Sequence, residues 1–199
     1  MVIVASNNIN QDKILNSYKR IVGNCDIALN SKIDSTPIIC SDEIKAPEIY
    51  DDGINLFNQA YTQGIGGHKG SVTYQGQVFD FIVLNIDACN KLNLSDAEFD
   101  GVFSHELGHI FNKYTSKNIP SVFDVMFNGA TKLTSDEESK IRYENKLNTE
   151  VFADKFSLKV NTQNGLIGSM EKFIKANPKQ NNQLFNDRLK ILKKSNNGG

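Results

Sequence analysis

The pentapeptide His-Glu-Leu-Gly-His at residues 105–109 constrains this chain more than any other segment, because it works as a unit only on a helix. It holds two of the three histidines in 199 residues. Ser95 and Glu98 form a capping box ahead of it, which predicts a helix over residues 95–114. Apolar residues at helical spacing predict the side of this helix that packs in the core: Phe99, Val102, Phe103, Ile110 and Phe111.

The spacing of the two histidines has a chemical meaning. Residues four apart lie on one helical face, so the imidazoles of His105 and His109 can point at one position. Zinc accepts nitrogen and oxygen ligands tetrahedrally, and a catalytic zinc site keeps one position for water. Glu106 can reach such a water, so the pattern predicts a zinc site with Glu106 as the catalytic carboxylate. The alternative is a helix with two surface histidines around a glutamate.

Two histidines need a third protein ligand, and the next helix offers one. A second capping box begins at Thr134 and predicts a helix to about residue 160. Glu150 and Asp154 lie among its apolar residues, where an unpaired carboxylate would be costly. We therefore predict Glu150 as the third ligand and Asp154 as the acceptor for the free N–H of a ligand imidazole. The alternative is an exposed face with both acids in solvent, and the rival third ligands are Glu144, Glu138, Asp124 and His68.

The composition is that of a globular protein without an electrostatic preference for nucleic acid. Basic and acidic residues number 22 and 23, for a formal net charge of -1. Three irregularly spaced cysteines favour neither a disulfide framework nor a cysteine-rich zinc module. No apolar run is long enough for membrane insertion, and the first residues lack the pattern of a secretory signal. We therefore expect a cytoplasmic location.

The pattern of elements predicts the α+β class and one domain over residues 1–199. A sheet-bearing part at about 1–115 is expected to meet a helical part at about 116–194, followed by a disordered tail at 195–199. A hairpin at about 72–86 surrounds the turn Gln75-Gly76. The other predicted elements are helices at 8–29, 52–62, 165–176 and 182–194, a strand at 37–40, a loop at 116–133, and a mobile glycine-rich loop at 63–71.

The histidine motif, followed some forty residues later by Glu150-x-x-x-Asp154, resembles the gluzincin metallopeptidases. The similarity is greatest to soluble relatives of the branch that contains the HtpX and CAAX prenyl-protein peptidases, and it covers roughly residues 98–160. The resemblance implies a zincin-like fold and a zinc-dependent endopeptidase. It also implies His105, His109 and Glu150 as ligands, Glu106 as base, and Asp154 as the residue that orients a ligand. The membrane helices of the best-known members are missing.

We expect Glu106 to take a proton from water and to deliver it to the leaving amine of a peptide or protein substrate. The oxyanion needs a further donor, for which the sequence offers His68, Tyr114, Tyr143 and Arg188 without choosing among them. The hairpin edge can bind an extended peptide as an added strand, or its strands can serve only to build the sheet. Two other functions stay open: a non-catalytic or regulatory protein with a zinc site, and a zinc hydrolase of a non-peptide amide.

Overall fold

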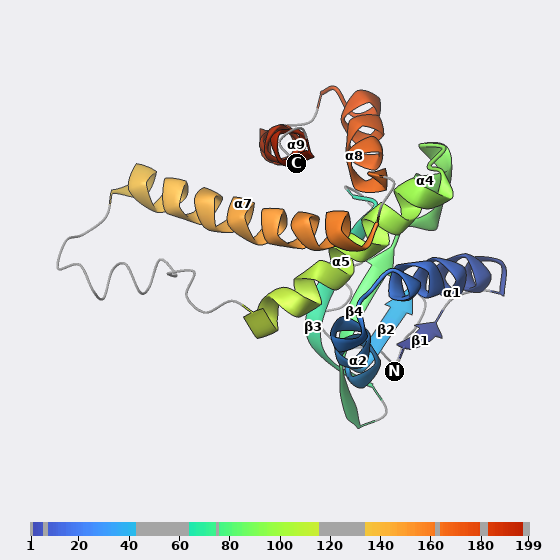
Figure 1. Cartoon of the computed structure of the whole chain (residues 1–199). Helices are drawn as coiled ribbons and strands as arrows, with labels where there is room; N and C mark the ends of the chain where they lie inside the picture. The colour runs from blue at the N-terminus through green and yellow to red at the C-terminus, as the bar shows by residue number, and fades with distance from the viewer. Residues whose placement is uncertain are drawn as a thin grey trace.

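The computed structural model describes residues 2–5, 8–42, 64–74, 76–115, 134–161, 164–179 and 183–196. Within these ranges the chain has the predicted α+β class, with mostly helices and one small sheet. Helix α5 (Asp96–Thr115) crosses the middle of the molecule, between the sheet and the helices that follow it in the chain (Figure 1). The predicted helix at 52–62 and the predicted loop at 116–133 lie outside the described residues.

The sheet has four strands among the described residues, in the order β1-β2-β4-β3. The strands are β1 (Val2–Ala5), β2 (Ile38–Ser41), β3 (Gly66–Tyr74) and β4 (Gln77–Leu84). β1, β2 and β4 are parallel, and β3 is antiparallel to β4. The central strands β2 and β4 are apolar and buried along most of their length, as expected for strands covered on both faces. The predicted strand at 37–40 is therefore confirmed as β2, whereas β1 was not predicted.

The single helix predicted at 8–29 was wrong, because two helices occupy this stretch. They are α1 (Asn8–Gly23) and α2 (Ile27–Ser35). Between them, the Asp26 side chain accepts a hydrogen bond from the backbone N–H of Leu29 at 2.8 Å. This is an N-terminal cap, so a new helix begins where the periodic pattern had suggested one continuous element.

The glycine-rich loop predicted at 63–71 was also wrong over most of its length, because β3 begins at Gly66. Ladder pairing with β4 outweighs the poor strand propensity of glycine, with His68 opposite Ile82. The register shifts between Lys69 and Val72, an irregularity that glycine tolerates well. Sequence propensity alone cannot include this pairing energy, which comes from a neighbouring strand.

The hairpin itself is confirmed, with β3 ending at Tyr74 and β4 beginning at Gln77. β4 ends at Leu84, two residues before the predicted end. Asn85 then caps a short helix that was not predicted, α4 (Ile86–Lys91), by accepting from the backbone N–H of Ala88 at 2.9 Å.

Helix α5 begins where the capping box predicted. The backbone N–H of Ser95 donates to Glu98 Oε2 at 2.7 Å, and the backbone N–H of Glu98 donates to Ser95 Oγ at 3.3 Å. The apolar residues predicted for the core are all buried. Helix α1 packs beside α5, and Arg20 Nε donates to Asp100 Oδ2 at 2.7 Å. Helix α5 is thus held against the sheet-bearing half of the chain.

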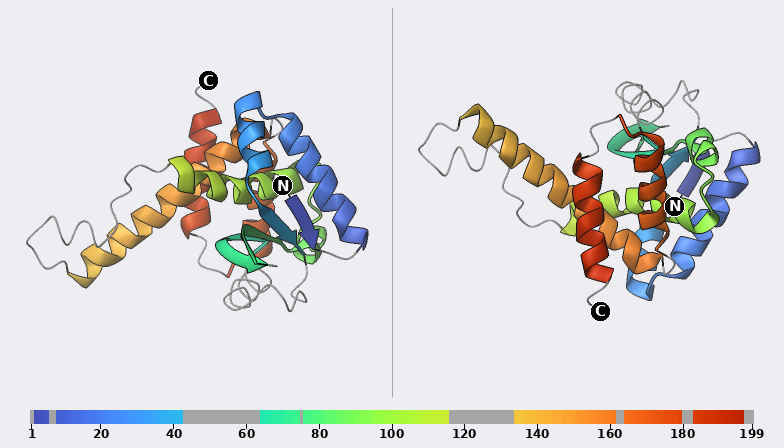
Figure 2. Two further views of the ribbon diagram at one scale, coloured as in Figure 1. Left: turned by 90° about the horizontal axis from the view of Figure 1, so that it is seen from below. Right: turned by 90° about the horizontal axis from the view of Figure 1, so that it is seen from above.

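The helices on the other side of α5 are α7 (Ser135–Val160), α8 (Gly165–Ala176) and α9 (Gln183–Asn196) (Figures 1 and 2). The predicted capping box at Thr134 and the predicted bounds of α8 are confirmed. Helix α9 includes Ser195 and Asn196, which had been predicted as disordered. The first turns of α7 extend beyond the other described elements (Figure 2). In the described part of the chain, no helix combines the length and apolar character that crossing a membrane requires.

Helix α5 approaches α7 and α8 closely because glycine lies at each contact. A Cβ built on Gly108 would lie 2.7 Å from Ala153 Cα in α7, and one built on Gly101 would overlap the backbone of Leu166 at the start of α8. A buried serine strengthens the first contact, since Ser157 Oγ donates to the carbonyl of Gly101 at 2.9 Å. Backbone atoms, which cannot rotate away as side chains can, therefore set the spacing of these helices.

Replacing Gly101 by alanine should destabilise the protein by about 1–3 kcal/mol, because the added methyl group forces α5 and α8 apart. Gly23→Ala is the matched control, since a Cβ there meets nothing within 4 Å. At that site we expect no loss, or a gain of up to about 1 kcal/mol from helix propensity. Urea unfolding measures both. Equal free energies of unfolding for the two variants would contradict the close contact at Gly101.

Candidate metal centre

Three of the predicted ligands converge in the structure. His105 and His109 lie one turn apart on α5, and Glu150 faces them from α7. The ligand atoms of these three residues all lie within 4.8 Å of one another. No other group of three or more such side chains occurs among the described residues.

The distances between the candidate donor atoms are close to those found in a tetrahedral zinc site. His105 Nε2 lies 3.1 Å from His109 Nε2 and 3.3 Å from Glu150 Oε2, and His109 Nε2 lies 3.8 Å from Glu150 Oε1. A tetrahedral ion with ligand bonds of about 2.0–2.1 Å places its donor atoms about 3.3 Å apart. The two histidine nitrogens and the Glu150 carboxylate are therefore close enough together to ligate one small cation.

Asp154 lies where an orienting carboxylate would be needed. His105 Nδ1 is 2.7 Å from Asp154 Oδ1, so its N–H donates to this carboxylate and Nε2 is left facing Glu150 and His109. Asp154 is completely buried, and it lies one turn after Glu150 on α7. One helix thus supplies both a candidate ligand and the group that fixes the ring of another.

Arg188 of α9 links the two carboxylates of α7. Its Nη1 lies 2.8 Å from Glu150 Oε2, while Nε and Nη2 donate to the two oxygens of Asp154 at 2.8 and 2.6 Å. A guanidinium suits this task because it presents several donors in a fixed plane. Nearby, the Tyr143 hydroxyl of α7 donates to Asp187 Oδ2 at 2.6 Å and helps to hold α9 in place. Arg188 therefore helps to hold the Glu150 carboxylate on the side of α7 that faces the two histidines.

Burial gives the titratable groups of this site unusual pKa values. Burial and the charge of Arg188 oppose protonation of His105, but its bonds to Asp154 and Glu150 outweigh them and raise its pKa to about 9. Burial raises the pKa of Glu106 to about 7. Burial, together with the charge of His105, lowers the pKa of His109 to about 3. Burial acts against ionisation of Glu150, yet the hydrogen bond and charge of His105 lower its pKa to about 2.

The raised pKa values of His105 and Glu106 occur in a site in which carboxylates outnumber the permanent cations. Glu106, Glu150 and Asp154 are three carboxylates, and Arg188 is the permanent cation beside them. Buried charges require compensation, and in the metal-free protein the protons on His105 and Glu106 supply it. A divalent cation between the histidines and Glu150 would replace them. The donor set of two imidazoles and one carboxylate is one that zinc prefers, so the residues present fit this ion.

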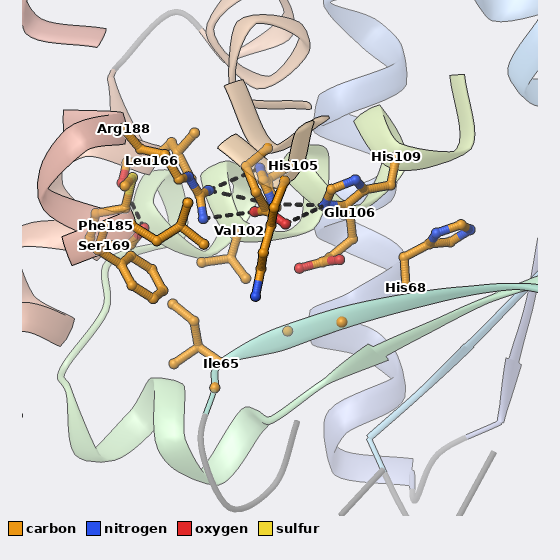
Figure 3. Close-up of a pocket in the computed structure, with 17 residues that line it drawn as sticks. Ile65, His68, Val102, His105, Glu106, His109, Leu166, Ser169, Phe185 and Arg188 are labelled. Carbon is orange, nitrogen blue, oxygen red and sulfur yellow. Dashed lines mark hydrogen bonds and ion pairs between the residues drawn. The ribbon is translucent and has the colours of Figure 1, made fainter. Parts of the chain in front are cut away.

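Glu106 projects from α5 into the space between the two histidines and strand β3 (Figure 3). A Cβ on Gly66 would lie 2.8 Å from Glu106 Oε1, so the backbone of β3 passes directly beside this carboxylate. Any side chain larger than hydrogen at position 66 would displace Glu106. The glycine that weakened the strand prediction thus makes room for the candidate base.

The converging residues line one cavity of about 430 Å³. Its floor is α5, one wall is the start of β3, and the opposite wall comes from α7, α8 and α9 (Figure 3). Such a volume is typical of sites that bind small molecules or a few residues of a peptide. The cavity is therefore large enough to admit a substrate beside the candidate metal position.

The structure separates the predicted oxyanion donors. His68 lines the cavity, stacks against His109 at 6.0 Å between ring centroids, and contacts Asp80 Oδ1 through Nε2 at 3.0 Å. Arg188 also lines the cavity, but each of its three nitrogens already contacts one of the two carboxylates. Tyr143 is not among the lining residues, because its hydroxyl is bonded to Asp187. The side chain of Tyr114 lies outside the described residues.

The rival third ligands do not join the group. Glu144 is exposed to solvent, and Glu138 lies 3.9 Å from Arg142 on the exposed side of α7. His68 is near the site but is not part of the group of converging donors. Asp124 lies outside the described residues.

Two functional contacts were missed in the sequence. Arg188 was considered only as an oxyanion donor, although it binds both acids of α7. Asp80, the partner of His68, lies in the second strand of the hairpin predicted at about 72–86 and was not singled out there. An isolated aspartate in that strand was the available signal, since a buried carboxylate needs a partner.

The comparisons with known proteins identify no relative. No protein-family model matches the chain. No curated protein matches it, and no solved structure does. Any statement about function must therefore rest on the site itself.

Removing Arg188 should destabilise the metal-free protein strongly. In Arg188→Leu the buried Asp154 carboxylate and the partly buried Glu150 carboxylate lose their cation, and we expect a loss of about 3–5 kcal/mol in urea unfolding. Arg142→Leu is the control, because that arginine is exposed and makes one long ion pair, 3.9 Å from Glu138. Its replacement should lower the free energy of unfolding by less than about 1 kcal/mol. Similar losses for the two variants would show that Arg188 does not carry this role.

Metal binding should release protons in a pH-dependent manner. At pH 7 His105 is protonated and Glu106 is about half protonated, so one bound cation should displace about one to one and a half protons. Release should fall to about half a proton near pH 9, where His105 is half protonated, and towards zero at higher pH. Titration calorimetry with zinc, in buffers of different ionisation enthalpy, measures the number released. A number that does not change between pH 7 and pH 9.5 would contradict the raised pKa of His105.

Proposed function

We propose that this chain is a zinc-dependent endopeptidase of zincin-like architecture. The observation that supports the proposal is the close grouping of the candidate donors in His105, His109 and Glu150, with Glu106 beside them in the same cavity. A site that only stabilises the fold has no need of a further carboxylate or an adjoining cavity. Both features favour catalysis over a regulatory or structural metal site.

A zinc ion at this position would supply a Lewis acid that polarises the scissile carbonyl and increases the acidity of a water. Glu106 then takes one proton from that water as the oxygen joins the carbonyl carbon. When the C–N bond breaks, Glu106 returns the proton to the leaving amine. Burial raises the pKa of Glu106 to about 7 in the metal-free protein, and a divalent cation beside it would lower that pKa, which favours the ionised form that accepts the proton.

The surroundings of the carboxylate suit an extended peptide. β3 is an edge strand of the described sheet, and its first residues line the cavity next to Glu106. An extended backbone can hydrogen-bond to such an edge as an added strand. His68 lies on the same strand and lines the cavity, so among the candidate donors it is the one we assign to the substrate carbonyl.

Glu106→Gln should still bind zinc and should lose peptide cleavage by about a hundredfold or more. The amide keeps the shape of the side chain but cannot accept the proton. Metal content is measured on the dialysed protein, and cleavage is measured on an unfolded protein substrate with and without a chelator.

Two further variants separate ligand loss from base loss. Glu150→Ala should lose bound zinc, whereas Glu144→Ala, with a glutamate on the exposed side of the same helix, should retain it. Retained cleavage in Glu106→Gln would remove this residue from the mechanism. A zinc-loaded protein that cleaves no peptide would instead favour a non-catalytic site or hydrolysis of a non-peptide amide.

A further inference from the structure

One side of the cavity is apolar, although the reacting groups beside it are charged. Figure 3 shows Phe185, Leu166 and Ile65 on one side of Glu106 and His68 on the other. The apolar side is built from four separate stretches of the chain. Its residues are Ile65 before β3, Val102 of α5, Leu166 and Met170 of α8, and Leu184 and Phe185 of α9.

Core packing accounts fully for some of these residues, in part for Phe185, and not for Leu184. Val102, Leu166 and Met170 are at most 3% exposed and belong to the interior. Leu184 and Phe185 are only partly buried, and both line the cavity. Phe185 rests on Phe173 with ring centroids 5.0 Å apart, so its position is fixed while one side stays accessible. Helix α9 thus presents fixed apolar surface to the cavity.

Water against this surface would be displaced favourably by an apolar side chain. The apolar surface and Glu106 line the same cavity, so a substrate side chain that binds this surface belongs to a residue close to the scissile bond. We propose that the cavity selects peptides with a large aliphatic or aromatic side chain beside the scissile bond, and that Leu184 and Phe185 determine this preference. The description of this ligand as a substrate rests on the endopeptidase proposed above.

Lys146 could instead favour peptides with an acidic side chain. It lines the same cavity, and a peptide carboxylate could pair with its ammonium group. However, Lys146 is solvent-exposed, so that pair would be screened and weak. The apolar surface is the larger and drier contact, and it should therefore dominate binding.

The test measures binding without catalysis. Zinc-loaded Glu106→Gln protein is titrated with capped peptides Gly-Gly-X-Gly-Gly, where X is leucine, phenylalanine, alanine or aspartate. The chain has three methionines, so a methyl-labelled sample gives few signals, and Met170→Leu identifies the one that lines the cavity. Leucine and phenylalanine peptides should bind at least about tenfold more tightly than the alanine peptide and should shift the Met170 methyl signal.

Leu184→Glu should abolish this preference, because it puts a charge into the apolar surface. Ile191→Glu is the matched control on the same helix, since Ile191 is partly buried but does not line the cavity, and it should keep the preference. Equal binding of all four peptides, tightest binding of the aspartate peptide, or an unmoved Met170 signal would overturn the proposal. If the preference holds but the unmodified protein cleaves none of these peptides or their longer versions, the endopeptidase proposal fails and the apolar subsite stands.

Discussion

The contact between the backbones of α5 and α7 at Gly108 and Ala153 is the constraint on which the rest of this structure depends. A Cβ at position 108 would lie 2.7 Å from Ala153 Cα, so only glycine allows the two helices to come this close. The contact lies between Glu150 and Asp154 in α7 and next to His109 in α5. It therefore brings the carboxylates of one helix within hydrogen-bonding distance of the imidazoles of the other.

That approach gathers like charges, and the surrounding structure compensates for them. Arg188 binds Glu150 and Asp154 at once, which makes the docking of α9 part of the site. One guanidinium cannot balance the buried carboxylates of Glu106 and Asp154 together with the partly buried Glu150, so the metal-free site takes up protons on His105 and Glu106. The same imbalance makes the position between the histidines and Glu150 favourable for a divalent cation. Charge, spacing and donor type therefore all favour the same kind of ligand.

Much of the local structure was predictable because it depends on short-range physics. The capping boxes at Ser95 and Thr134 place the starts of α5 and α7, and the helical repeat places the buried residues of α5. Prediction failed where a distant segment decides the local conformation. Residues 66–71 form a strand only because β4 lies beside them. The break between α1 and α2 was missed for another reason, since the Asp26 cap is a local signal that the helical periodicity obscured.

The sequence by itself determined the chemical inventory of the site: two histidines on one helical face, a glutamate between them, and two acids one turn apart on a later helix. These follow from the fixed geometry of the α-helix, which relates residues three and four apart regardless of context. Only the tertiary structure decided that Glu150 faces the histidines, that Arg188 neutralises both acids, and that Gly66 lets an edge strand pass beside Glu106. Those relations join residues far apart in the chain, and they arise from helix packing and buried charge that no local pattern encodes.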